Sequence, residues 1–193
     1  VMFDPPDFTD PATCDNEFLL QSSLWACMLG ERRGSYEFDE YGRMVIPAAD
    51  VDAQAVSLFG QNIKLEHMTI GDMENAYQYD SDIASYHVPI IAMTGFATPS
   101  VEKIVMKQDS CQLTVGYVPP TTVLSINYDS KGNLEETPSK YMLYELRKNG
   151  KDFYLYSVTT IMNDSVSGTE FNTGTVGRVD TLTPSDSQGS GNT

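Results

Sequence analysis

The sequence predicts an α+β fold in which two helices precede a run of antiparallel strands. Residues 15–30 and 47–60 carry apolar side chains at helical spacing. After His67 the apolar residues recur with a period of two, which is typical of strands. Because the helices precede the strands instead of alternating with them, we expect both helices to pack on a curved antiparallel sheet of about five to seven strands.

The first helix is expected between Asp15 and Gly30. Its apolar residues fall on two neighbouring stripes: Leu20, Leu24 and Met28 on one, and Phe18, Trp25 and Leu29 on the other. A helix that is so broadly apolar is expected to pack in a groove against the sheet. Asp10 or Asp15 is available as the N-terminal cap, and Gly30 is a natural end.

The second helix is the clearest element of the sequence. Pro47 stands at its first turn, and Asp50 and Asp52 lie where the helix dipole favours negative charge. Its apolar residues recur at i, i+4, i+7 and i+8: Val51, Ala55, Leu58 and Phe59. This spacing predicts one buried stripe, and Gly60 is expected to end the helix.

Alternating residues predict three hairpins and one further strand in the second half. The hairpins are expected over 76–80 with 85–91, 101–107 with 111–118, and 140–148 with 152–161, and the further strand over 122–128. The last hairpin carries the strongest signal, because Asn149-Gly150 suits a type I′ turn. Both faces of this hairpin are partly apolar, so we expect the pair to lie in the interior of the sheet.

Composition divides the chain into three parts. Residues 1–14 are rich in Pro and Asp and are expected to be an extended lead-in. Residues 15–162 form a single α+β domain in this interpretation. Residues 163–193 are rich in Ser, Thr, Gly, Asp and Asn, and we expect a polar tail with room for one weak strand.

The charge is strongly negative and unevenly distributed. The chain has 27 acidic and 12 basic side chains, for a net charge of −15. Residues 1–89 carry 16 acids and 4 bases, whereas residues 90–162 carry 7 of each. A nucleic-acid partner is excluded, because it would need a basic footprint. We also expect no transmembrane segment, because no apolar run approaches the roughly 18–20 residues that span a bilayer.

Three cysteines, Cys14, Cys27 and Cys111, have a spacing that matches no metal or redox motif. An odd number allows at most one internal bridge. We predict no metal site and no cofactor, because the sequence also lacks phosphate-binding and dinucleotide-binding loops.

Two histidines are the residues best suited to acid–base catalysis. His87 lies in an expected strand, with Asp80 and Asp82 across the hairpin, and His67 precedes that hairpin. A histidine can act as a base near neutral pH, and His87, His67 and Asp82 are therefore the candidate catalytic residues. No nucleophile motif accompanies them, and a hydrogen-bonded structural histidine is the competing interpretation.

Aromatic side chains gather in the last hairpin: Tyr141, Tyr144, Phe153, Tyr154 and Tyr156. Cross-strand packing is one interpretation of this cluster. The other is an exposed face that binds a peptide, a glycan or a partner protein. In that case Tyr141, Tyr144, Tyr154 and Tyr156 are the candidate binding residues.

Two resemblances extend these expectations. In the order of their elements, residues 15–162 resemble the cystatin-like and nuclear-transport-factor-like folds, in which helices lie in the concavity of a bent sheet. The segments that carry the second resemblance are Ile46-Pro47-Ala48 through Leu58-Phe59-Gly60, Tyr86-His87-Val88-Pro89 and Leu113-Thr114-Val115-Gly116-Tyr117. They look like uncharacterised extracellular or lipoprotein domains of Gram-positive gut bacteria. This resemblance implies an exported protein at the bacterial surface, with an export signal that preceded Val1.

We therefore predict an exported, non-catalytic binding or structural module. One alternative is a small-molecule enzyme with a His/Asp/Tyr site in the concavity of a cone-shaped sheet. A second alternative is an interaction domain that forms a homodimer through its sheet. An open pocket lined by a histidine and a carboxylate would favour the enzyme, whereas a concavity filled by Phe18, Trp25 and Leu29 would count against it.

Overall fold

The computed structural model describes residues 5–72, 76–90, 97–120 and 138–161, and it has the expected α+β fold. The expected strand over 122–128, the tail over 163–193 and its weak strand lie outside these residues. The two helices are α1 (Asn16–Leu29) and α2 (Ala48–Phe59), and two short 3-10 helices are η1 (Pro11–Thr13) and η2 (Glu31–Ser35).

The described strands form two sheets of four, whereas the sequence predicted one sheet. The small sheet has the order β1 (Glu37–Phe38), β2 (Met44–Pro47), β4 (Ser85–Val88), β3 (Gln78–Asp80). The large sheet is a meander of β5 (Thr98–Met106), β6 (Ser110–Val118), β7 (Lys140–Asn149) and β8 (Asp152–Ile161). All neighbouring strands pair antiparallel.

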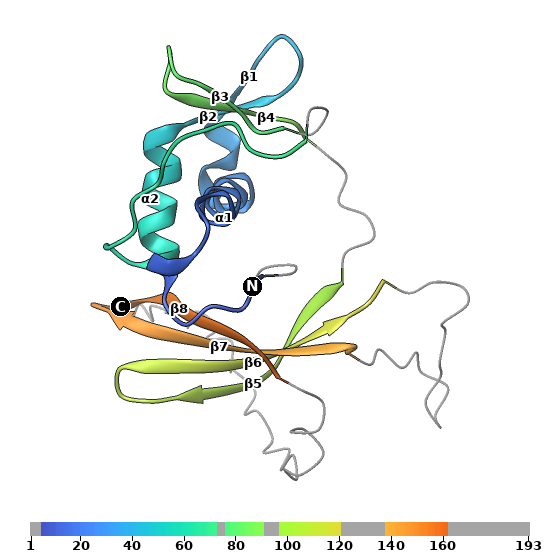
Figure 1. The fold of residues 1–193 in the computed structure, drawn as a ribbon. Helices are drawn as coiled ribbons and strands as arrows, with labels where there is room; N and C mark the ends of the chain where they lie inside the picture. Colours follow the sequence, from blue (N-terminus) through green and yellow to red (C-terminus); the bar gives the residue numbers. More distant parts are fainter. Residues whose placement is uncertain (1–4, 73–75, 91–96, 121–137, 162–193) are drawn as a thin grey trace, which may run out of the picture.

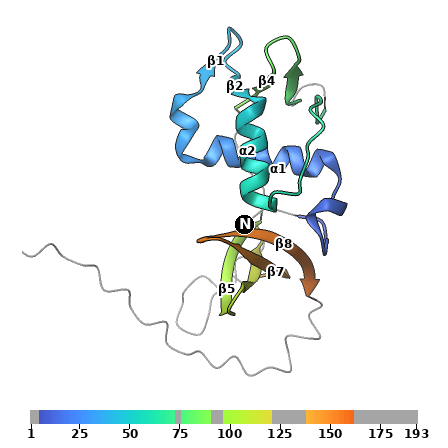
Figure 2. The same cartoon turned by 90° about the vertical axis from the view of Figure 1, so that its left-hand side faces the viewer.

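The helices form a layer between the two sheets (Figures 1 and 2). Figure 1 shows the small sheet above α1 and α2 and the large sheet below them. The small sheet has its own apolar face, because Met44 and Ile46 pair with Val88 and Tyr86 and all four are buried. The hairpin of β3 and β4 therefore joins β2 rather than the large sheet. The core is continuous through all three layers.

The start of α1 and the end of α2 are set by local contacts as the sequence predicted, whereas Pro47 precedes α2 as the last residue of β2 and provides no side-chain cap. The Asp15 side chain accepts a hydrogen bond from the Glu17 amide at 2.7 Å, so Asp15 is the cap of α1 and Asp10 caps η1. Gly60 ends α2 with a φ of 90°, and its amide donates to the carbonyl of Val56. On α1 the stripe of Leu20, Leu24 and Met28 is buried, whereas Leu29 is 66% exposed.

The last hairpin differs from the prediction in its turn and in its place. Asn149 pairs with Asp152, so Gly150 and Lys151 form the tip. Of these two residues only Gly150 has a positive φ, at 64°, and a type I′ turn would require both. The strand β7 is interior as expected, but β8 is the last strand of the sheet. The lead-in covers part of this edge, because Phe8 forms two backbone hydrogen bonds with Val158.

No helix in the described part of the chain combines the length and the apolar character needed to cross a bilayer.

Candidate functional site

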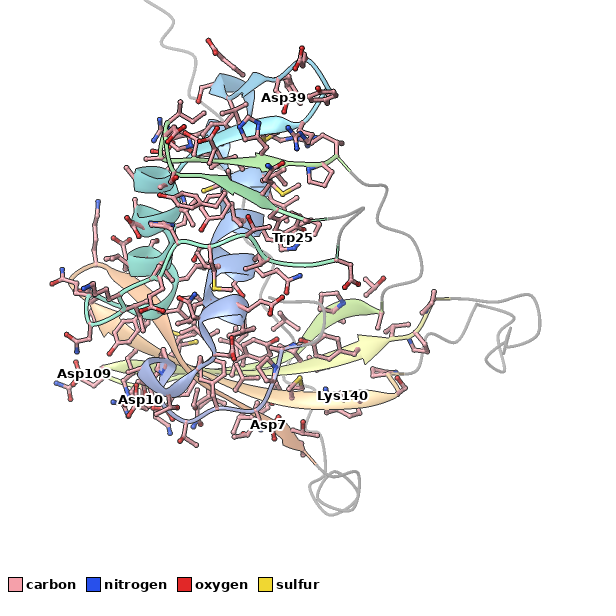
Figure 3. All side chains as sticks on the ribbon, turned by 45° about the horizontal axis from the view of Figure 1, so that its top comes forward. Asp7, Asp10, Trp25, Asp39, Asp109 and Lys140 are labelled. Carbon is pink, nitrogen blue, oxygen red and sulfur yellow. The ribbon has the colours of Figure 1, made fainter. Side chains whose placement is uncertain are left out.

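A surface groove of about 420 Å³ lies where the helical layer meets one end of the large sheet. Three segments line it: residues 10–12 at η1, residues 59–63 at the end of α2, and the end of the β7–β8 hairpin, with residues 147–149, Tyr154 and Tyr156. In Figure 3, Asp10 lies beside the large sheet, and Asp39 is at the other end of the molecule. The groove is therefore formed by residues distant in sequence.

A bulge in β8 positions the two tyrosines of the groove. Glu145 pairs with Ser157 and Leu146 pairs with Leu155, so Tyr156 is an extra residue without a cross-strand partner. Leu155 and Val158 are both buried in the core despite their spacing of three. The half-buried rings of Tyr154 and Tyr156 belong instead to the groove wall.

Gly60 allows the end of α2 to approach β8 closely. A Cβ atom at this position would lie 3.1 Å from two ring carbons of Tyr154. The φ of 90° also favours glycine, because side chains rarely tolerate this conformation. Gly60 thus ends the helix and allows the Tyr154 ring to pack against its backbone.

Arg147 is fixed above the ring of Tyr156. Its guanidinium carbon lies 3.0 Å from the ring centroid, and its Nε donates to Glu145 Oε1 at 3.3 Å. The Arg147 side chain is 43% exposed, so it remains accessible to solvent while it makes these two contacts. This stacked arrangement combines a cation–π contact with an ion pair.

Three amide side chains contribute to the groove's polar surface. Gln61, Asn62 and Asn149 are exposed at its rim. Within the residues that the structure describes, none of these three side chains has a hydrogen-bond partner. Each amide offers both donors and an acceptor, so the groove can hydrogen-bond a ligand that presents hydroxyl or carbonyl groups.

The other two candidate binding tyrosines lie elsewhere. Tyr144 is buried in the core, and its hydroxyl forms a hydrogen bond with that of Tyr117. Tyr141 is half-buried and does not line the groove. The five aromatic residues of this hairpin therefore do not form one face.

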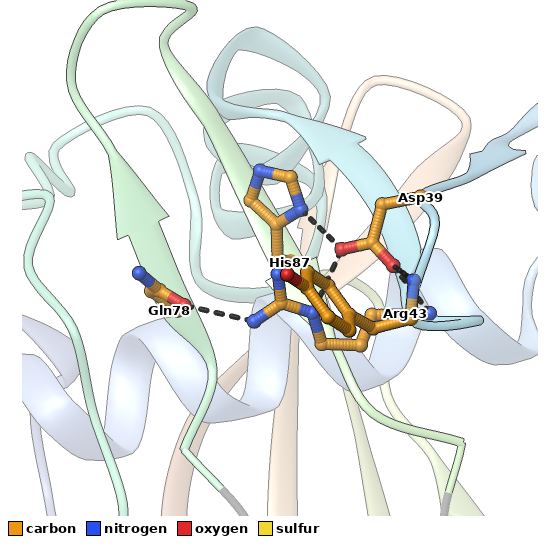
Figure 4. A network of polar contacts seen from close by, with 5 residues as sticks. Asp39, Arg43, Gln78 and His87 are labelled. Atoms are coloured by element: carbon orange, nitrogen blue, oxygen red, sulfur yellow. Dashed lines mark hydrogen bonds and ion pairs between the residues drawn. The ribbon is translucent and has the colours of Figure 1, made fainter.

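His87 lies in a polar network on the small sheet (Figure 4). Its Nδ1 donates to Asp39 Oδ2 at 2.8 Å, and Arg43 Nε donates to the same oxygen at 2.7 Å. Arg43 Nη1 in turn donates to Gln78 Oε1 at 2.8 Å. The carboxylate partner of His87 is thus Asp39, not the Asp80 and Asp82 that the sequence had placed across the hairpin.

Asp82 is exposed at the tip of the β3–β4 hairpin. Its amide donates to Asp80 Oδ1 at 2.9 Å, which is ordinary turn chemistry. The structure therefore does not bring Asp82 together with either histidine.

Hydrogen bonds to Asp39 make the acid stability of the protein depend on this residue. Partial burial raises the pKa of the Asp39 carboxyl, but hydrogen bonds from Arg43, His87 and the Tyr41 amide outweigh it and hold the pKa well below its usual range. A carboxyl with a lowered folded-state pKa adds stability that is fully present above its unfolded value, roughly 3.9. That stability is lost as the pH falls from there through the folded-state pKa.

We expect Asp39→Asn to lower the melting temperature by several degrees at pH 7 and to flatten its decrease below about pH 4. Thermal unfolding followed by circular dichroism from pH 7 to the acid limb measures both effects. Asp82→Asn is the matched control, since it removes an exposed carboxylate from a turn. An unchanged acid limb in Asp39→Asn would show that other carboxylates determine it.

His67 belongs to a second network, on the inner side of the small sheet. Its Nδ1 lies 3.0 Å from the Tyr86 hydroxyl, and its Nε2 lies 3.3 Å from Asp52 Oδ1. Its ring stacks on Tyr79 with 5.3 Å between centroids. Burial raises the pKa of Tyr86 to about 12, and Tyr86 is 0% exposed. This hydroxyl is therefore a structural hydrogen-bonding group that a substrate cannot reach.

The three cysteines are free thiols. Burial raises the pKa of Cys14 and of Cys27 to about 11, so neither is a reactive thiolate near neutral pH. In the described ranges, no group of three or more His, Cys, Asp and Glu side chains is placed to hold a metal ion.

No family model matches the chain, and no curated protein or solved structure matches it either. The resemblance to bacterial surface domains and the type of α+β fold thus stay predictions.

Proposed function

We propose that the protein is a non-catalytic binding module and that its groove takes a short stretch of a glycan. The observation that carries this proposal is that Tyr154 and Tyr156 share one groove with amide side chains that have no hydrogen-bond partner among the described residues. The location at a bacterial surface, expected from the sequence, remains part of the proposal.

The size and the polarity of the groove support a polyhydroxyl ligand. A volume of about 420 Å³ lies within the usual range for small ligands, roughly 300–1,000 Å³. Most such sites are lined by apolar groups, whereas amides and charged groups form much of this one. The half-buried ring of Tyr154 offers apolar surface to the C–H groups of a sugar, whereas the Arg147 guanidinium covers one face of Tyr156. The amides of Gln61, Asn62 and Asn149 can pair with the sugar hydroxyls.

The histidine networks give less support to the enzyme alternative. Neither His67 nor His87 lines the groove. Asp39 already accepts four hydrogen bonds from Tyr41, Arg43 and His87, and the Tyr86 hydroxyl is buried. Both networks have the character of structural hydrogen-bonding groups that stabilise the small sheet.

The proposal is tested with an immobilised panel of neutral and acidic oligosaccharides. We expect the wild-type protein to bind at least one of them, and Tyr154→Ala and Tyr156→Ala to weaken that binding by about tenfold or more. The matched control is Tyr41→Ala, which removes a tyrosine that is 75% exposed on the small sheet. The proposal is wrong if the wild-type protein binds no member of the panel, or if the groove variants bind as well as the control.

A further inference from the structure

We infer that the groove recognises an acidic sugar and that Arg147 binds the carboxylate of this sugar. This inference rests on the proposed glycan binding and specifies the class of glycan. It starts from the geometry of Arg147, whose guanidinium lies over a tyrosine ring and beside a carboxylate.

Two contacts fix the orientation of the Arg147 guanidinium. The ring of Tyr156 lies beneath it, 3.0 Å from the guanidinium carbon, and Glu145 Oε1 accepts from its Nε at 3.3 Å. A stacked and ion-paired guanidinium loses little additional freedom when a ligand binds. Such preorganisation improves affinity, because most of the conformational entropy of the side chain is already lost in the free protein.

The terminal nitrogens of Arg147 remain available to a ligand. A guanidinium has five N–H donors, and Nε uses one of them on Glu145. In the part of the chain that the structure describes, this contact is the only hydrogen bond or ion pair of the Arg147 side chain. The two terminal nitrogens form a planar fork that matches the two oxygens of a carboxylate.

The charged side chains in and beside the groove are balanced, in contrast to the acidic chain as a whole. Arg147 and Lys148 line the groove, and Asp10 is the one acidic residue among its lining residues. One oxygen of Asp10 accepts from the Ala12 amide at 2.9 Å. Asp10 and the Glu145 carboxylate paired with Arg147 balance these two cations, so the geometry of the Arg147 fork, and not the net charge of the groove, would select a carboxylate.

The glycan character of the ligand follows from the remaining lining residues. A site for a carboxylate alone needs only the cation, yet the groove also presents Tyr154 and three exposed amides. An acidic sugar uses all of these groups, because it carries a carboxylate on a ring with several hydroxyls. Uronic acids are the simplest members of this class.

The inference is tested by NMR titration of the wild-type protein with matched pairs of small probes. The pairs are glucuronate, galacturonate and N-acetylneuraminate, each with its own methyl ester, and hexaglutamate serves as an acidic peptide. We expect the acid of at least one pair to bind tenfold or more tightly than its ester, and hexaglutamate to bind more weakly than that acid.

The variant Arg147→Lys keeps the positive charge but removes the planar pair of terminal nitrogens. We expect this variant to lose most of the preference for the acid while its affinity for the ester changes less than threefold. Arg33→Lys is the matched control, because Arg33 is exposed on η2 and is not among the groove's lining residues. Tyr156→Leu is expected to reduce the preference as well, since it removes the surface that orients Arg147.

The outcomes distinguish this inference from the proposed function. If neutral sugars bind and acidic sugars bind no more tightly, the groove binds glycans but Arg147 does not bind a carboxylate. If Arg147→Lys keeps the full preference for the acid over the ester, the guanidinium does not recognise the carboxylate and the inference is wrong. If hexaglutamate binds as tightly as the best acidic sugar, the groove recognises charge alone. If no sugar binds at all, both proposals fail.

Discussion

Truncating Leu24 to alanine is expected to lower the free energy of unfolding by about 2–5 kcal/mol. Leu24 is 0% exposed and lies on α1, in the layer between the two sheets. The change removes one methine and two methyl carbons from a continuous core, and neighbouring side chains can fill the resulting cavity only in part. A loss of this size is a large fraction of the stability of an ordinary domain, roughly 5–15 kcal/mol.

Leu29→Ala is the matched control, because it makes the same change on the same helix at a side chain that is 66% exposed. We expect this variant to change the free energy of unfolding by less than about 0.5 kcal/mol. Urea denaturation of both variants measures the difference. Equal losses would contradict the placement of α1, since the sequence alone had assigned both leucines to apolar stripes.

Replacing Tyr86 with phenylalanine is expected to cost about 1–3 kcal/mol of unfolding free energy. The hydroxyl of Tyr86 is fully buried and links two groups, the Met68 backbone amide and His67 Nδ1. When His67 is neutral, Nδ1 can accept from this hydroxyl and Nε2–H can donate to Asp52. Removing the hydroxyl leaves the Met68 amide and His67 Nδ1 without this partner.

Tyr79→Phe is the matched control for Tyr86→Phe. Tyr79 stacks on His67, but its hydroxyl has no hydrogen-bond partner among the residues that the structure describes. We expect the control to change stability by less than about 0.5 kcal/mol. Urea denaturation at pH 7 again provides the comparison, and a neutral Tyr86→Phe variant would show that the network contributes nothing to stability.

The helices could be predicted because local residues determine them. Asp15 caps α1 through a contact two residues away, and Gly60 ends α2 through its own backbone conformation. The three hairpins also have short turns, so their strands are near neighbours in sequence. The division into two sheets could not be predicted, because it depends on the pairing of β2 with β4, some forty residues apart.

The candidate site was predicted only in part for the same reason. Tyr154 and Tyr156 are visible in the sequence as aromatic residues of a strong hairpin, but the bulge that separates them from the core is not. Arg147 gave no signal, since its role depends on a ring across the hairpin. Gln61 and Asn62 follow α2 and reach the groove only through the packing of that helix against β8.

The histidines illustrate the limits of reasoning from neighbours in sequence. His87 was expected to face carboxylates of its own hairpin, yet the register of β2 and β4 places it beside Val45 and near Asp39. The spacing of Asp39 and Arg43 at i and i+4, on either side of the turn at Gly42, was the one local sign of this network.

Glycan binding in the groove is tested most directly by a ¹⁵N–¹H NMR titration of the protein with the oligosaccharide that it retains most tightly from the panel. We expect shift changes concentrated at the amides of residues 60–63, 147–149 and 154–156, which line or border the groove. We also expect these changes to disappear in Tyr156→Ala. Shift changes centred on His67 and His87 in the small sheet would contradict glycan binding in the groove.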